Sequence, residues 1–154
     1  MDEMGLLSRL KSAFSEPPLI DELVTLTGRH EFVTNRLARH AALLTVVPIK
    51  RSVTEIAERE QAHQKRLRAI LAERGLWPRP PESEPRDGAN HWERLSGDLE
   101  MLLAFAQELN AHALKWEGGN PKLRDELLKI ANEAAISEIE LRRIAAKCDP
   151  QALD

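Results

Sequence analysis

Apolar residues recur along most of the chain at alternating intervals of four and three positions, which places them on one face of an α-helix. Tyrosine is absent, and leucine, alanine, glutamate and arginine dominate, a composition that favours helices over strands. Glycine and proline separate the apolar series from one another. We therefore predict four long helices, at residues 19–47, 53–75, 91–116 and 121–147.

The boundary between the first two helices is predicted from three residues. Pro48 follows the first apolar series and is expected to end that helix. Ser52 and Glu55 have the spacing of a capping box, in which each side chain satisfies a backbone amide at the start of a helix. These signals place the turn of the first hairpin near residue 50.

The third and fourth helices begin at similar signals. Asn90 is followed three positions later by Glu93, which is the capping pattern with asparagine as the first member. Asn120 precedes Pro121, an N-cap residue followed by a proline in the first helical position. We therefore predict that these helices start near residues 91 and 121.

Short turns within each pair of helices make two antiparallel hairpins. We therefore predict an all-α fold, an antiparallel up-down four-helix bundle. The 154 residues suffice for one domain, which we place at residues 19–148. Residues 1–18 form an amphipathic segment that can add a short N-terminal helix, and residues 149–154 form a C-terminal tail.

Four polar residues interrupt the apolar faces of the first two helices: His30, His40, Glu60 and His63. Helices of a hairpin rise equally, by about 1.5 Å per residue, so positions whose numbers sum to about 100 lie level if the turn is near residue 50. His40 is then expected to face Glu60, with His63 about one turn from both and His30 at another height. Burying these groups without partners would cost several kcal/mol, so a neighbouring side chain, water or metal ion must satisfy them.

Glu60 and His63 form a Glu-x-x-His motif on one helical face. In this motif the chain resembles the ferritin-like carboxylate bundles, in which facing helices supply Glu and Glu-x-x-His ligands to two metal ions. The fourth helix offers Glu138, but Leu141 stands where the second motif has histidine. The resemblance therefore implies a ferritin-like bundle with a single metal site formed by His40, Glu60, His63 and Glu138. Iron, zinc and manganese all accept such imidazole and carboxylate ligands.

A second interpretation needs no metal. The His-Glu-His layer can be a hydrogen-bonded polar plug that fixes helix pairing in a non-enzymatic interaction module. The third helix carries Leu103, Phe105 and Leu114 beside its core face, which is more apolar surface than one partner helix covers. We therefore expect self-association as a homodimer or larger oligomer.

Charge and composition restrict the remaining classes. The 22 basic and 25 acidic residues give a net charge of −3, and no motif or aromatic platform for nucleic acid accompanies the arginines. The single cysteine, Cys148, excludes a disulfide framework within the chain. The longest apolar run is too short to cross a bilayer, and no secretory signal pattern is present. We therefore expect a cytoplasmic protein with no nucleic-acid partner and no transmembrane segment.

Overall fold

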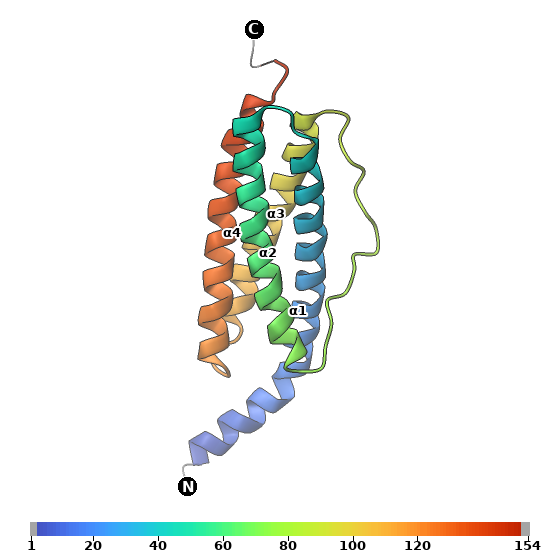
Figure 1. Ribbon diagram of the computed structural model, residues 1–154. Helices are drawn as coiled ribbons and strands as arrows, with labels where there is room; N and C mark the ends of the chain where they lie inside the picture. The colour runs from blue at the N-terminus through green and yellow to red at the C-terminus, as the bar shows by residue number, and fades with distance from the viewer. Residues whose placement is uncertain (1–2, 152–154) are drawn as a thin grey trace.

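The computed structural model describes the backbone of residues 3–151 and the side chains of residues 16–151. The chain forms a bundle of four helices, which confirms the predicted all-α class (Figure 1). Their bounds are α1 Glu3–Leu43, α2 Val47–Ala72, α3 His91–Leu114 and α4 Pro121–Lys147. Within the described residues, no helix is both long and apolar enough to span a membrane.

Each helix packs against two others, α1 and α4 each lying between α2 and α3. Every packed pair is antiparallel, as the ion pairs of α1 with α3 illustrate: Arg29 bonds to Glu108, and Arg36, one to two turns later on α1, bonds to the earlier Asp98. Consequently α2 and α3 run in the same direction on a diagonal of the bundle. Residues 73–90, here called the strap, connect them by running back along the part of α1 that lies in the bundle (Figure 1).

The buried core has two apolar clusters with a polar layer between them. One cluster includes Leu67, Leu102 and Ala134, and the other includes Ile56, Leu95 and Leu141. Between these positions each helix contributes buried polar residues, which are Thr34 and Arg36 on α1, Glu60 and His63 on α2, Asp98 on α3, and Ser137 and Glu138 on α4. The polar layer is therefore built by all four helices rather than by one hairpin.

The first hairpin turn lies about five residues earlier than predicted. Pro48 is one of the first two residues of α2, and Val46 is its N-cap, so the proline begins the second helix instead of ending the first. A proline in the first turn loses no hydrogen bond, because that amide has no intrahelical partner. Ser52 lies inside α2, where its hydroxyl donates to the carbonyl of Pro48 at 3.1 Å. The predicted capping box at Ser52 is therefore wrong.

The predicted starts of α3 and α4 are confirmed. Asn90 Oδ1 accepts from the amide of Glu93 at 2.8 Å, and the Glu93 carboxylate accepts from the amide of Ala89 at 2.7 Å. Asn120 Oδ1 accepts from the amide of Leu123 at 3.1 Å. At the other end of the chain, α1 begins well before residue 19 and continues through Pro17 and Pro18; its first turns project away from the bundle (Figure 1).

The strap is attached to α1 at a glycine. The amide of Arg79 donates to the carbonyl of Val24 at 3.1 Å. A Cβ atom at Gly28 would lie 1.6 Å from the carbonyl oxygen of Arg79, so any larger residue would exclude the strap from this position. The strap therefore packs directly against the backbone of α1 at Gly28.

Candidate functional site

Glu60 lies at the centre of a buried polar group contributed by α1, α2 and α4. Its Oε1 accepts from His30 Nε2 at 3.0 Å, and its Oε2 accepts from the hydroxyl of Ser137 at 2.9 Å. His63, three residues further along α2, places Nδ1 3.0 Å from the same Oε2. The side chains of His30 and Glu60 have no exposed surface, and that of His63 is 3% exposed. We call His30, Glu60 and His63 the His-Glu-His group.

Two imidazole nitrogens of this group have no hydrogen-bond partner. His63 Nδ1 is close enough to Glu60 for an ion pair, but its direction does not align with the carboxylate oxygen, and it remains unsatisfied. His30 Nδ1 is buried and unpartnered as well. Unsatisfied buried polar atoms are uncommon in native proteins, and a bound water or ion is one of the explanations for them.

A second carboxylate holds the far side of the His63 ring. Glu133 of α4, 36% exposed, accepts from His63 Nε2 at 2.6 Å. Since a carboxylate can only accept, this contact fixes the proton on Nε2 when the ring is neutral and leaves Nδ1 with a free lone pair. The Ser137 hydroxyl, which donates to Glu60, in turn accepts from Arg59 at 3.2 Å. Glu133 therefore orients the His63 ring, and Ser137 orients the Glu60 carboxylate.

The electrostatics of the group favour an ionised carboxylate. Burial raises the pKa of Glu60, but the hydrogen bond from His30 and the positive charges of His30 and His63 outweigh burial and hold the pKa at about 2. Burial lowers the pKa of His63, and its contacts with Glu60 and Glu133 more than compensate, so that the pKa lies above the usual value. Glu60 is therefore negatively charged throughout the physiological pH range.

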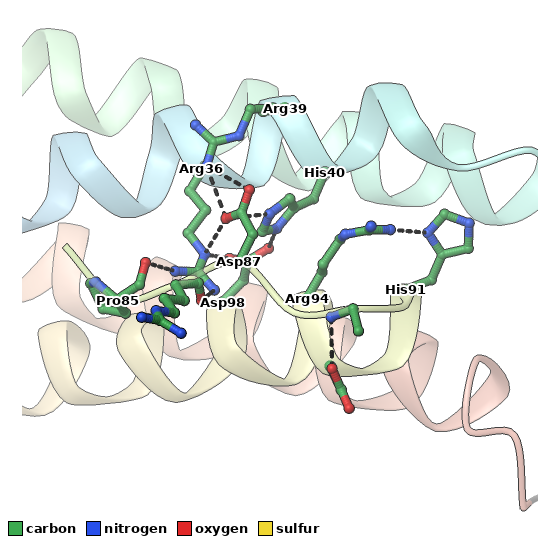
Figure 2. Close-up of polar contacts among 11 residues, drawn as sticks. Arg36, Arg39, His40, Pro85, Asp87, His91, Arg94 and Asp98 are labelled. Atoms are coloured by element: carbon green, nitrogen blue, oxygen red, sulfur yellow. Dashed lines mark hydrogen bonds and ion pairs between the residues drawn. The ribbon is translucent and has the colours of Figure 1, made fainter.

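His40 does not belong to the group. Its Nδ1 lies 2.5 Å from Asp98 Oδ2, and its Nε2 lies 3.1 Å from Asp87 Oδ1, so both ring nitrogens already have carboxylate partners (Figure 2). It is ten residues beyond His30 on α1, about 15 Å along the helix. The expected pairing of His40 with Glu60 is wrong because the turn near residue 45 makes positions summing to about 90 level, and His30 is the residue that satisfies this sum.

Arg36 completes the site around His40, with buried Arg36, His40 and Asp98 joined to the strap (Figure 2). Its Nε donates to Asp98 Oδ1 at 2.8 Å, and its terminal nitrogens donate to the carbonyls of Pro85 and Arg86 at 3.2 and 3.3 Å. Because these bonds link α1 and α3 to the strap, we call Arg36, His40, Asp87 and Asp98 the strap anchor.

Glu138, the fourth predicted metal ligand, also lies apart. It is buried, with 3% of its side chain exposed, and pairs with Arg142 one turn later on α4. Of the four residues predicted from the sequence, the structure brings together Glu60 and His63, and adds His30. Pro48 is the sequence signal that could have identified His30. If Pro48 is taken as the start of the second helix, the turn lies near residue 45 and His30 is level with Glu60.

The three residues of the His-Glu-His group have the arrangement needed to hold one metal ion. One ligand atom from each lies within 4.8 Å of the other two. Ligands about 2.0–2.2 Å from a common ion are roughly 3.0–3.5 Å apart, and both contacts with Glu60 have this separation. The donor types and the unsatisfied Nδ1 of His63 therefore fit a bound cation, with Nε2 as the ligand atom of His30.

No protein-family model matches the sequence, and no curated protein is similar to it. The function of this chain is therefore inferred from the chemistry of its own residues.

Proposed function

We propose that the protein binds a single divalent transition-metal ion through His30, Glu60 and His63. The observation that carries this proposal is the convergence of two imidazoles and one carboxylate within 4.8 Å in a buried layer. Two histidines and one carboxylate are the donor set of mononuclear non-haem iron(II) sites, and zinc and manganese accept the same ligands. Three protein ligands leave open positions on the ion for water or a small molecule.

The outer residues support this assignment. Glu133 accepts from Nε2 of His63, so that Nδ1 is the nitrogen presented to the ion, and Ser137 orients Glu60. Metal-bound histidines commonly donate their other ring nitrogen to a carboxylate in this way. Binding requires neutral histidines, so metal uptake displaces a proton from His63 and weakens as the pH falls through its raised pKa.

The long strap supports the ferritin-like relationship inferred from Glu60 and His63, since bundles of that class contain one long crossover connection. Their two-metal site needs a second Glu-x-x-His motif, and Leu141 occupies its histidine position on α4. We therefore propose a mononuclear site on a ferritin-like scaffold, with His30 in the place that the sequence had suggested for His40.

Metal titration of the purified, chelator-treated protein tests the proposal. We expect wild-type protein to bind one equivalent of Fe²⁺, Zn²⁺ or Mn²⁺, measured by calorimetry and elemental analysis. Glu60→Gln should weaken binding at least 100-fold, and Glu133→Gln should weaken it by about 10- to 100-fold through the loss of His63 orientation. Glu138→Gln is the matched control, because this buried glutamate lies outside the group. Folded wild-type protein that takes up none of the three ions would contradict the proposal.

The purely structural interpretation of the layer makes a different prediction. In that case Glu60 stabilises the bundle through hydrogen bonds alone. The wild-type protein would then bind no metal, and Glu60→Gln would lower only the stability of the fold. Self-association remains a prediction of this interpretation, but its expected contact Phe105 is 3% exposed and cannot mediate it. Ile136 and Ile139 of α4, 53% and 48% exposed, are better candidates. Sedimentation velocity of Ile136→Lys against wild type would show whether they hold two copies together.

A further inference from the structure

A cavity lies beneath the strap, with Phe105 in its lining. Its volume is about 200 Å³. The lining is mainly apolar and comes from α1, α3 and the strap: Phe32, Val33, Met101, Phe105, Pro81 and Pro85. None of these residues belongs to the His-Glu-His group, so the cavity is a separate feature of the fold.

The roof of this cavity is held in place by the strap anchor. Pro85, which lines the cavity, has its carbonyl bonded to the buried Arg36 at 3.2 Å. Two residues later, Asp87 accepts from Arg39 at 3.0 Å and contacts His40 at 3.1 Å (Figure 2). A pocket whose walls are already fixed loses little conformational entropy when a ligand enters.

The charges of the lining favour an uncharged ligand. Arg29 and Glu108 are its only charged residues, and they form an ion pair with 2.8 Å between Nη1 and Oε2. Neither charge is therefore free to neutralise a charged ligand. An ionic molecule would lose hydration in this apolar space without gaining a partner.

We propose that this pocket binds an uncharged molecule of single-ring size. An apolar cavity of about 150 Å³ in a protein interior accepts benzene, so a volume of about 200 Å³ suits one ring with a small substituent. The Phe105 ring lies 4.4 Å from the His30 imidazole, between centroids. Phe105 therefore lies next to both the pocket and the His-Glu-His group.

Methyl NMR of metal-free protein labelled with ¹³C-methyl methionine tests the pocket directly. Met101 lines it, and its signal is assigned with Met101→Leu. We expect benzene to produce a saturable shift of the Met101 signal, and benzoate to bind at least tenfold more weakly. Ala104 is an exposed lining residue, so Ala104→Phe should fill the space and weaken benzene binding at least tenfold.

The matched control is Ala111→Phe, the same substitution at an exposed site of α3 outside the lining; it should bind benzene as wild type does. The proposal is overturned if wild type shows no saturable shift, if benzoate binds as tightly as benzene, or if Ala104→Phe binds benzene as tightly as wild type. Because the assay uses metal-free protein, its failure would leave the metal proposal standing, and a failed metal titration would leave this pocket intact.

Discussion

Replacing Glu60 with glutamine in the metal-free protein is expected to destabilise the bundle in a pH-dependent way. The side chain keeps its shape but loses the charge that faces His30 and His63, both of which contact the carboxylate at 3.0 Å. The group is fully buried, so solvent does not screen the loss. The cost should therefore approach the full free energy contained in the shifted pKa.

The pKa of Glu60 sets the magnitude. It falls from an ordinary value of 4.5 to about 2, and each unit corresponds to about 1.4 kcal/mol, giving roughly 3 kcal/mol at pH 5.5. A depressed carboxyl pKa contributes stability above the unfolded value and loses it as the pH falls toward the folded value. The contribution should therefore decline to about 2 kcal/mol at pH 3.5.

The raised pKa of His63 reports in part the same contact, so its contribution is not added to that of Glu60. For a histidine with a raised pKa, the contribution is complete below the ordinary value of 6.5 and is lost as the pH rises through the folded pKa. The pair of Glu60 and His63 should therefore stabilise the bundle most between about pH 4.5 and 6.5.

Urea unfolding of wild type and Glu60→Gln, followed by circular dichroism at pH 5.5 and 3.5, measures the effect. Glu58→Gln is the control, an exposed site on the same helix where the change should cost less than about 0.5 kcal/mol. The reasoning is refuted if Glu60→Gln costs no more than Glu58→Gln at pH 5.5, or if the cost grows on acidification.

Three further substitutions test the fold around the site. Arg36→Met should cost roughly 3–5 kcal/mol in urea unfolding, because buried Asp98 loses one of its two cationic partners and two strap carbonyls lose their donor. The exposed Arg39→Met should cost less than about 1 kcal/mol, and equal costs would contradict a buried strap anchor. Gly28→Ala should release the strap, seen as faster hydrogen exchange at its anchored amides, since the new Cβ would overlap a strap carbonyl; unchanged exchange would count against that contact. Asn120→Ala should cost about 1 kcal/mol by removing the cap of α4, and an unchanged urea midpoint would show that the cap contributes nothing.

Two of the three residues in the His-Glu-His group were predicted from the sequence, and the position of the first turn explains why the third was not. Periodicity identified Glu60 and His63 as inward-facing, and both are buried. Their partner was misassigned because Pro48 fits two interpretations, the end of one helix and the first turn of the next. A shift of five residues in the turn moves the level position on the opposite helix by ten, from His40 to His30. An error in the position of a hairpin turn is therefore doubled in the number of the residue predicted to face a given position.

The strap anchor could not have been predicted from helical periodicity. Neither Arg36 nor Asp98 belongs to the apolar series of its helix. Both are buried because the strap covers them, with the carbonyls of Pro85 and Arg86 accepting from Arg36. An irregular segment has no repeating pattern from which its path can be deduced, so its contacts follow only from the assembled structure.

The amino-acid sequence by itself determined the number of helices, the apolar faces of α2, α3 and α4, and the starts of α3 and α4 at Asn90 and Asn120. These features depend on interactions within a few residues of one another, such as a cap bonding to an amide three positions away. Only the tertiary structure decided which histidine meets Glu60 and where the strap lies. Those outcomes depend on contacts between residues 30 or more positions apart. Local periodicity shows which face of a helix is buried, but not which residue of another helix or segment lies opposite it.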